Sequence, residues 1–157
     1  MQRKETTNPL ETADISACPR QGRIVSIDPG TKFVGVAVTD ETQTVSRPVG
    51  TLPRTSWKRL LSDIKKVISD FDAVAVVVGL PLGFEGGRIE MTGEAESIAH
   101  RLSLSLQLPV FLQDERVTTY EARKRLWDRG VQPVATKSKV DAEAAAIILS
   151  DFLSRRK

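Results

Sequence analysis

The sequence is built around Arg23-Ile-Val-Ser-Ile-Asp28-Pro-Gly-Thr-Lys-Phe-Val-Gly-Val-Ala-Val-Thr-Asp40, in which two apolar runs flank an Asp-Pro-Gly-Thr turn. The β-branched residues on both sides of Pro29-Gly30 predict a hairpin, and Asp28 then lies where its first strand ends. An aspartate at such a position commonly accepts hydrogen bonds from the backbone of the turn itself. The same carboxylate could instead form the floor of an active site, and the hairpin alone leaves both hypotheses open.

Length and composition are those of one globular domain. The chain has 157 residues, of which 40% are hydrophobic, enough to bury a core without disulfides. The single cysteine, Cys18, excludes an internal disulfide, and no cysteine and histidine cluster suggests a zinc site. We expect a reducing cytosol and no membrane partner, since no stretch resembles a signal peptide or a membrane span. Residues 1–22 are polar and aperiodic, which predicts a flexible arm before a single domain at 23–157.

Strands and helices alternate after the first hairpin. Residues 44–52 predict a third strand, which Pro48 restricts to a sheet edge or a strand end. Ser56 can cap a helix whose apolar residues follow helical spacing as far as Phe71. The unbroken apolar run at 73–80 is typical of a strand that is covered on both faces. A strand, a helix and a second strand in this order predict a parallel pairing and an α/β architecture.

The second half of the chain continues this alternation. A glycine-rich stretch at 79–88 follows the last strand at the edge where open α/β sheets bind ligands, but it lacks the Gly-Lys-Ser/Thr ending of a P-loop. The further predicted elements are a helix at 90–107, a strand at 110–116 and a helix from Thr118 to Gly130. A last helix at about 139–154 is expected to carry Asp141 in its first turn.

Carboxylates are predicted at three separate ends of elements: Asp28, the pair Asp114-Glu115, and Asp141. Each has an ordinary explanation, since Asp141 could belong to a helix cap begun by Ser138 and the pair could form surface ion pairs. Together they are the oxygen ligands that Mg²⁺ or Mn²⁺ prefers. Two such ions about 3.5–4 Å apart can activate water and stabilise the leaving oxygen in phosphodiester hydrolysis.

Positive charge gathers in the last third of the chain. Residues 116–157 hold ten lysines and arginines against five aspartates and glutamates, although the net charge of the whole chain is only +3. A solvated surface would explain this excess, and so would a polyanionic partner such as structured RNA or branched DNA. The expected phosphate contacts are the basic residues near the acidic positions: Arg116, Arg123, Arg125 and Lys139. Aromatic residues are 5% of the chain, and no stacking platform is evident that would separate RNA from DNA.

Five motifs, in this order, resemble the YqgF/RuvX family. The match extends over residues 23–154, and its motifs are Ser26-Ile-Asp28-Pro-Gly-Thr-Lys-Phe-Val-Gly-Val-Ala-Val, Val78-Gly-Leu-Pro-Leu82, Asp114-Glu-Arg-Val-Thr-Thr119, Glu121-Ala-Arg123 and Lys139-Val-Asp141-Ala-Glu-Ala-Ala-Ala-Ile-Ile-Leu149. The resemblance implies an α/β, RNase H-like fold with a mixed five-stranded sheet flanked by helices. It also implies a bacterial cytoplasmic nuclease, related to Holliday-junction resolvases of the RuvC type and assigned to maturation of the 5′ end of pre-16S ribosomal RNA.

The same resemblance assigns roles to the acidic residues. Asp28 is implied as the metal ligand of the first strand, and Asp141 as the ligand on the last helix. Glu115 is the expected intervening carboxylate, with Asp114 as the alternative. The strand that ends in Gly79-Leu80-Pro81 departs from the RuvC-type resolvases, which place an acidic residue there.

Two rival hypotheses stay open in the sequence. The Asp-Pro-Gly-Thr hairpin also resembles the phosphate-binding hairpin of actin-like ATPases and sugar kinases, but those proteins enclose ATP between two such domains and this chain has room for one. The chain could also bind structured RNA or branched DNA without cutting it, with the carboxylates serving as turns and caps. Neither the number of metal ions nor an oligomeric state follows from the sequence.

Overall fold

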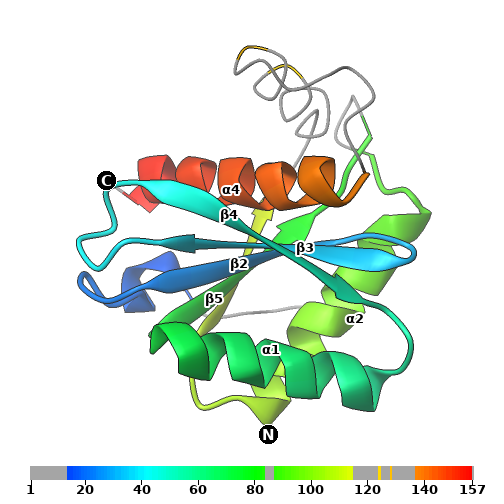
Figure 1. Ribbon diagram of the computed structural model, residues 1–157, viewed down its shortest axis with the longest axis horizontal. Helices are drawn as coiled ribbons and strands as arrows, with labels where there is room; N and C mark the ends of the chain where they lie inside the picture. Colours follow the sequence, from blue (N-terminus) through cyan, green and yellow to red (C-terminus); the bar gives the residue numbers. More distant parts are fainter. Residues whose placement is uncertain (1–13, 84–86, 115–123, 125–127, 129–136, 157) are drawn as a thin grey trace, which may run out of the picture.

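One mixed sheet organises the residues that the structure, a computed structural model, describes: 14–83, 87–114, 124, 128 and 137–156 (Figure 1). Its five strands run in the order β4-β3-β2-β5-β6. They are β2 (Ile24–Pro29), β3 (Phe33–Thr39), β4 (Ser46–Pro53), β5 (Ala75–Leu80) and β6 (Val110–Asp114). The described helices are α1 (Trp57–Phe71), α2 (Glu90–Ser105) and α4 (Lys137–Arg156), and the short 3₁₀ helix η1 covers Ile15–Ala17.

The strand pairing confirms the predicted meander and the parallel crossover. β2 pairs with β3, and β3 with β4, in antiparallel register. β5 is parallel to β2, and β6 is parallel to β5. β4 lies at one edge of the sheet, as Pro48 predicts. Because β2, β5 and β6 are parallel, their carboxyl ends share one edge of the sheet, which is the edge that positions the candidate site.

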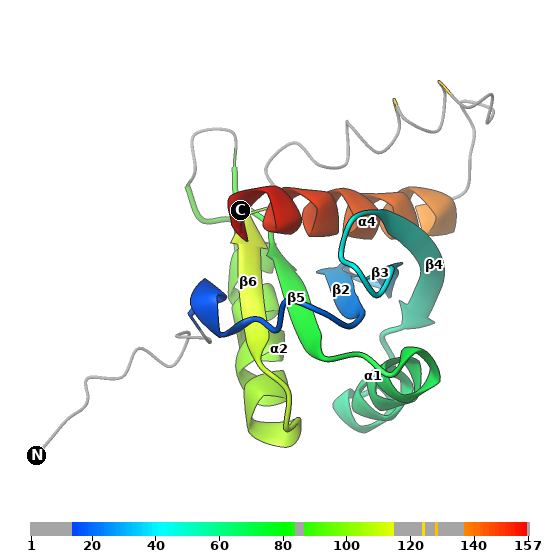
Figure 2. The ribbon, with the colours of Figure 1, turned by 90° about the vertical axis from the view of Figure 1, so that its left-hand side faces the viewer.

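Helices cover the two faces of the sheet unequally. In the described residues α4 crosses one face, here called the α4 face, whereas α1 and α2 lie on the other, the α1/α2 face (Figures 1 and 2). Alternate residues of β2 and β5 enter two separate hydrophobic clusters, as strands buried on both faces require. The cluster of the α1/α2 face includes Val25, Ile27, Val36, Val78, Leu60, Ile64 and Leu102. The cluster of the α4 face includes Ile24, Ala37, Val77, Phe111, Ile148 and Phe152.

α1 begins and ends where the sequence predicts. The Ser56 side chain accepts a hydrogen bond from the backbone N–H of Arg59, which satisfies one of the free donors at the helix start. Leu60 and Ile64 are buried on the side that meets the sheet. Asp72 then adopts the left-handed conformation, with φ of 54°, and its N–H closes the helix end.

α4 starts earlier than predicted. It begins at Lys137, so Asp141 is its fifth residue, and its first turn carries no acidic residue. Ser138 lies inside the helix, and the cap suggested for Ser138 and Asp141 is therefore wrong. Serine favours caps through side-chain bonds to nearby N–H groups, but this preference is weak and the helix continues through it here. Asp141 is only 9% exposed, which a capping role at the surface does not explain.

Residues 14–22 pack onto the sheet, which differs from the predicted flexible arm. Cys18 is 5% exposed and belongs to the cluster of the α4 face. Gln43 Nε2 donates hydrogen bonds to the carbonyls of Pro19 and Gly22, at 2.9 and 3.0 Å. One buried cysteine in a polar segment creates no periodicity, so the sequence gives no signal for this contact.

Several predictions fall outside the described residues. These are the arm at 1–13 and the helix from Thr118 to Gly130, of which only Lys124 and Asp128 are described, both in helical conformation. Within the described ranges, no helix is both long and apolar enough to cross a lipid bilayer.

Candidate active site

Asp28 lies at the carboxyl edge of β2 with its side chain on the α4 face. Residues two apart on a strand share a face, and Ser26 Oγ donates a 2.6 Å hydrogen bond to the carbonyl of Ala145 in α4. Asp28 therefore faces the same helix, and it is 9% exposed. The turn that follows is closed by Gly30, whose N–H donates to the Phe33 carbonyl at 2.9 Å.

Gly35 allows Asp141 to lie beside Asp28. Gly35 is opposite Asp28 in the β2–β3 ladder, where the Cα atoms of paired residues are about 4.5–5.5 Å apart. A Cβ atom at Gly35 would lie 2.1 Å from the backbone oxygen of Asp141 and 2.5 Å from its carbonyl carbon. The backbone of α4 at Asp141 thus occupies the space that a side chain at position 35 would need. The structure brings these two predicted site residues together.

Small residues hold α4 close to the sheet over its following turns. Ala145 and Ala146 are fully buried. The Ser46 hydroxyl donates to the carbonyl of Ala146 at 2.9 Å and shares a 2.8 Å hydrogen bond with the Ser150 hydroxyl. Ser26 and Ser46, from two different strands, thus both bond to backbone carbonyls of the helix. These contacts require a short distance between helix and sheet, and they fix where the second turn of α4 lies.

Asp114 lies at the same edge of the sheet but on its other face. Val110 and Leu112 pack into the cluster of the α1/α2 face, whereas Phe111 packs into that of the α4 face. Alternation along β6 therefore directs Asp114 to the α1/α2 face, away from Asp28. β5 also separates β6 from β2. The structure does not bring Asp114 to the carboxylates of the α4 face.

The remaining predicted site residues cannot be placed with the same detail. Glu115, Arg116, Arg123 and Arg125 lie outside the described residues. Lys139 is in the first turn of α4, two residues before Asp141, but its side chain is not described. Across the residues that are described, no three Asp, Glu, His or Cys side chains are arranged to hold a metal ion. That part of the chain supplies two of the predicted ligands and not a complete metal site.

Two residues near the site were not singled out by the sequence. Glu143 is 1% exposed, and its side chain leaves α4 about 200° around the helix axis from that of Asp141. The feature of the sequence that could have identified Glu143 is a carboxylate within a run of small residues, Ala-Glu-Ala-Ala-Ala. Gly35 is the second of these residues. Its signal in the sequence is a glycine inside an apolar strand, which indicates that another backbone approaches closely. The sequence alone does not say which segment approaches it.

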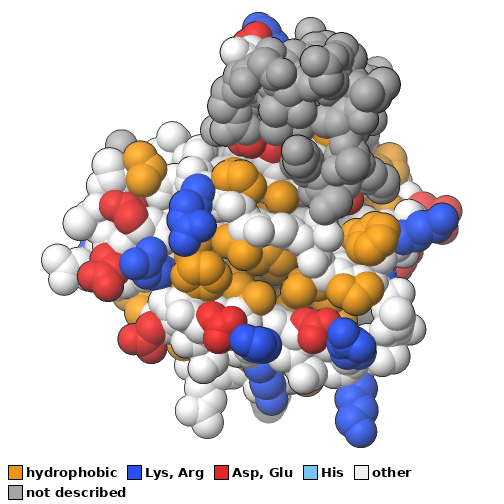
Figure 3. Space-filling view, viewed as in Figure 1, with side chains coloured by type: hydrophobic (Ala, Val, Ile, Leu, Met, Phe, Trp, Pro, Cys, Tyr) orange, Lys and Arg blue, Asp and Glu red, His pale blue; other side chains and the backbone are white. Residues whose placement is uncertain are grey.

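The face of the molecule in Figure 3 carries charges of both signs. Apolar side chains gather in its middle over β4 and α1, and acidic and basic side chains alternate along its lower border. On α1, the ion pairs Arg59–Asp63 and Lys66–Asp70 have N–O distances of 3.1 and 2.9 Å. A mixed surface of this kind does not attract a polyanion as a one-sign surface would.

Comparisons with known proteins agree on one family. Residues 22–155 match the family model of RuvX, which is described as a Holliday junction resolvase. A protein of Anaeromyxobacter sp. strain K, named "Putative pre-16S rRNA nuclease", is 40% identical over 134 residues, which are 85% of this chain and 98% of that protein. A Shewanella oneidensis protein of the same name is 35% identical over 129 residues, which are 82% of this chain and 92% of its own.

Solved structures with the same fold are resolvases. RuvC of T. thermophilus in complex with a Holliday junction substrate has a TM-score of 0.53 at 19% identity, covering 85% of this chain and 95% of RuvC. The yeast mitochondrial Holliday junction resolvase Ydc2 has a TM-score of 0.51 at 11% identity, covering 90% of this chain and 82% of Ydc2. These likenesses confirm the predicted RNase H-like fold, and the family match confirms the resemblance seen in the motifs. The chain belongs to the RuvX family.

Proposed function

We propose that the chain is a metal-dependent nuclease that hydrolyses phosphodiester bonds. The observation that carries the proposal is the juxtaposition of Asp28 and Asp141, from opposite ends of the chain, at the carboxyl edge of the sheet. Both carboxylates are 9% exposed. Two buried acidic residues brought to one place would favour the binding of a cation, and ligands in open α/β sheets bind at this edge.

The donor set fits Mg²⁺ or Mn²⁺, because its members are carboxylates and these ions prefer oxygen ligands. Asp28 and Asp141 would hold the metal, with Glu115 as the third ligand. Position 115 is four residues after Phe111, which faces α4, so an extended chain would direct it to the same face. Asp114 is three residues after Phe111 and would be directed to the opposite face. The period of two along β6 therefore favours Glu115 over Asp114. When bound, such ions activate a water molecule and stabilise the leaving oxygen.

The basic residues of the last third of the chain are proposed to hold the substrate. Arg116, Arg123, Arg125 and Lys139 lie close in sequence to the acidic motifs and would contact phosphates. Arginine suits this role because its planar group bonds two phosphate oxygens at once.

The substrate that we propose is pre-16S ribosomal RNA, cut in the processing of its 5′ end. The names of the relatives support it, since they match the chain over nearly their whole length. Branched DNA is the second candidate, supported by the description of the family and by the fold likeness to RuvC. The third candidate is a protein that binds nucleic acid without cutting it, and an experiment must distinguish this binding from cleavage.

A cleavage assay tests the nuclease proposal. An RNA that spans the 5′ precursor boundary of 16S rRNA and a four-way DNA junction are each incubated with Mg²⁺, Mn²⁺ or EDTA. We expect Asp28→Asn, Asp141→Asn and Glu115→Gln each to lower the rate by more than about a hundredfold, because loss of an outer partner of a metal ligand alone costs about 10–100-fold. Circular dichroism and thermal melting check that each variant folds.

Two matched variants act as controls. Asp114→Asn changes the neighbouring carboxylate on the other face, and Asp70→Asn changes an exposed one on α1. Both should keep the rate within about twofold, as surface substitutions away from a site do. If folded Asp28→Asn and Asp141→Asn proteins cut like the wild type, the chain is not a nuclease of this kind. If Asp114→Asn is inactive and Glu115→Gln is active, the assignment of the third ligand is reversed.

A further inference from the structure

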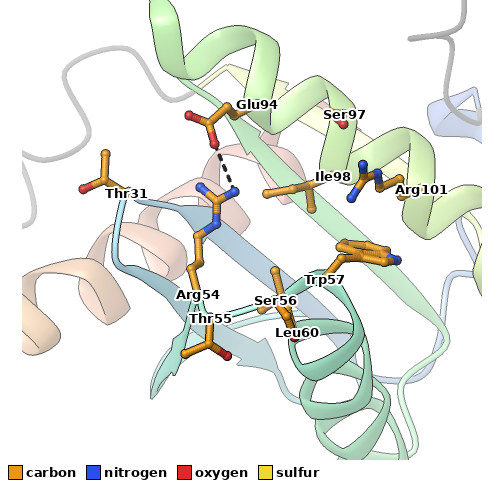
Figure 4. A pocket seen from close by; sticks show the side chains of 10 residues that line it. All are labelled: Thr31, Arg54, Thr55, Ser56, Trp57, Leu60, Glu94, Ser97, Ile98 and Arg101. Carbon is orange, nitrogen blue, oxygen red and sulfur yellow. Dashed lines mark ion pairs between the residues drawn. The ribbon is translucent and has the colours of Figure 1, made fainter.

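A pocket of about 420 Å³ lies between α1 and α2, beside the turn that joins β2 to β3 (Figure 4). Arg54 connects it to that turn, since its Nη1 donates a 2.9 Å hydrogen bond to the carbonyl of Gly30. Gly30 is two residues after Asp28, so the pocket adjoins the edge of the sheet that carries the candidate active site. The residues that define it include Thr31, Arg54, Ser56, Trp57, Ile98 and Arg101.

The floor of the pocket is apolar. Trp57, the first residue of α1, forms one part, and the nearly buried Leu60 and Ile98 form the rest from the two facing helices. In Figure 4 the Trp57 ring lies below Arg101, and Ile98 points toward the middle of the space. Ligand sites commonly combine apolar side chains with placed polar groups, and the lining of this pocket contains both kinds. The space is large enough for a planar aromatic group and not only for a small ion.

The two arginines of the pocket are held in different ways. Arg54 is fixed, because its Nη2 pairs with Glu94 Oε1 at 3.0 Å in addition to its bond to the Gly30 carbonyl. Arg101 lies with its guanidinium 5.3 Å from the centre of the Trp57 ring. In the described part of the chain no carboxylate pairs with Arg101. The charges of Arg54 and Glu94 offset each other, so Arg101 leaves the pocket with an excess positive charge.

Arg101 should bind an anion more strongly than it binds the Trp57 ring, which it contacts now. A cation–π contact at an exposed site is weaker than a charge-assisted hydrogen bond to a phosphate oxygen. A phosphate at the rim would therefore draw Arg101 away from the indole. The ring face that it leaves is then open to a base, which stacks on aromatic side chains regardless of sequence.

The start of α1 adds to the positive character of the rim. Acidic residues are favoured in the first turn of a helix, where the dipole is positive, but the first turn of α1 has none. Its second residue is Lys58 instead, and the side chain of Arg59, the next residue, pairs with Asp63 outside the pocket. The Ser56 and Thr55 side chains at this end line the pocket and can bond to an anion.

We propose that this pocket, on the α1/α2 face near the edge of the sheet that carries Asp28, binds one nucleotide of a single-stranded segment of the substrate. Its phosphate lies at the rim, between Arg101 and the start of α1, and its base lies on the floor against Trp57. The base is expected to be unpaired, because the faces of a base inside a duplex are covered by its stacked neighbours and are not open to the indole. The inference rests on the proposed function, since it places the nucleotide in the strand that passes Asp28.

Fluorescence of Trp57 tests the proposal in the absence of any cleavage. The chain has two tryptophans, so the Trp127→Phe variant of the full chain leaves Trp57 as the reporter. A five-nucleotide single-stranded RNA is titrated in EDTA, and we expect it to quench the emission. Inorganic phosphate and the unphosphorylated nucleoside are titrated separately, and neither alone should reproduce the response, because the pocket is inferred to use both groups.

Arg101→Gln supplies the second measurement. We expect it to weaken binding of the five-nucleotide RNA about tenfold, from the loss of one charge-assisted contact, and to reduce the slope of log K against log salt by about 0.7. Arg59→Gln is the matched control, since it removes an arginine of α1 that pairs with Asp63 outside the pocket. It should change the affinity less than about twofold.

The outcomes separate this inference from the proposed function. If the protein cuts RNA but the oligonucleotide does not quench Trp57, the pocket is not a nucleotide site and the nuclease assignment stands. If Trp57 is quenched, and Arg101→Gln weakens binding, while no cation supports cleavage, the pocket stands and the proposed function fails. A full response to inorganic phosphate alone, or equal affinities of Arg101→Gln and Arg59→Gln, would overturn the inference.

Discussion

The α1/α2 face of the sheet is filled by large aliphatic side chains, whereas the first half of α4 meets β2, β3 and β4 on the other face through small residues. On the first face Leu102 and Ile64 reach across to the sheet and are almost completely buried. On the second, Gly35 touches the backbone of α4 at Asp141, and Ser26 bonds to the carbonyl of Ala145. The stability of the α1/α2 face should therefore be most sensitive to the loss of side-chain atoms. The contact between α4 and the sheet should be most sensitive to added atoms.

The difference explains why the carboxylates gather on the α4 face. A site needs side chains held to within fractions of an ångström by rigid elements. Backbone contacts between α4 and the sheet supply that precision for Asp28 and Asp141. Aliphatic packing has no fixed direction of contact, so the α1/α2 face is better suited to supplying stability than to fixing the position of a single side chain.

Loss of atoms on the α1/α2 face should have the largest effect on stability. Leu102 is fully buried in α2, and Leu102→Ala is expected to lower the free energy of unfolding by about 2–5 kcal/mol through lost burial and a cavity. Urea denaturation measures the change. The matched control is Leu104→Ala, two residues further along α2, where the side chain is 74% exposed and the change should stay within about 0.5 kcal/mol. Equal values for both variants would mean that α2 does not pack as described.

One added methyl group on the α4 face should have the next largest effect. Gly35→Ala is expected to lower the free energy of unfolding by about 1–3 kcal/mol, the usual range for overpacking, because the new Cβ meets backbone atoms that cannot turn away. It should also lower the cleavage rate at denaturant-free conditions, since α4 must shift at Asp141.

Gly50→Ala is the matched control for this methyl group. Gly50 lies in β4 of the same sheet, and a Cβ there meets nothing within 4 Å. The variant should be at least as stable as the wild type, because alanine has less backbone entropy to lose than glycine. If Gly35→Ala and Gly50→Ala behave alike in unfolding and in cleavage, close approach of α4 does not position the site.

Local patterns in the sequence account for most of the fold but not for these contacts. The first hairpin, the stripe of α1 and the buried run of β5 each follow from spacing within one element. The contact between Gly35 and Asp141 joins residues from opposite ends of the chain, and spacing carries no information about such pairs. Spacing likewise carries no information about the pocket, because Arg54 and Arg101 line it from segments that are far apart in the sequence.

The candidate site was predictable only in part for the same reason. The resemblance to a family singled out Asp28 and Asp141, and their ordinary roles as turn and cap residues were equally consistent with the residues themselves. The start of α4 was missed because Ser138 carries a cap signal that the helix does not use. Strand alternation, available only once the packing of β6 is known, directs Asp114 to the α1/α2 face, and Glu115 lies outside the described residues.

A change in the turn between β3 and β4, which belongs to neither face, should have the smallest effect. The Asp40 carboxylate accepts hydrogen bonds from the Thr42 hydroxyl and from the N–H groups of Val45 and Thr44, and these lower the pKa of Asp40 to about 2. Because the folded pKa lies below the ordinary value of 3.8, the charged form stabilises the fold above pH 4. That stabilisation is lost as the pH falls from about 4 to about 2.

Asp40→Asn keeps an oxygen acceptor at Oδ1 but removes the charge, and charged acceptors bond more strongly than neutral ones. The variant should therefore be less stable than the wild type at pH 6, by less than Gly35→Ala, and the two proteins should converge as the pH approaches 2. Urea midpoints measured from pH 6 to pH 2 check this, with Asp70→Asn as a control for an exposed carboxylate paired with a lysine. A difference that stays constant with pH would trace the effect to the altered hydrogen bonds and not to the charge of Asp40.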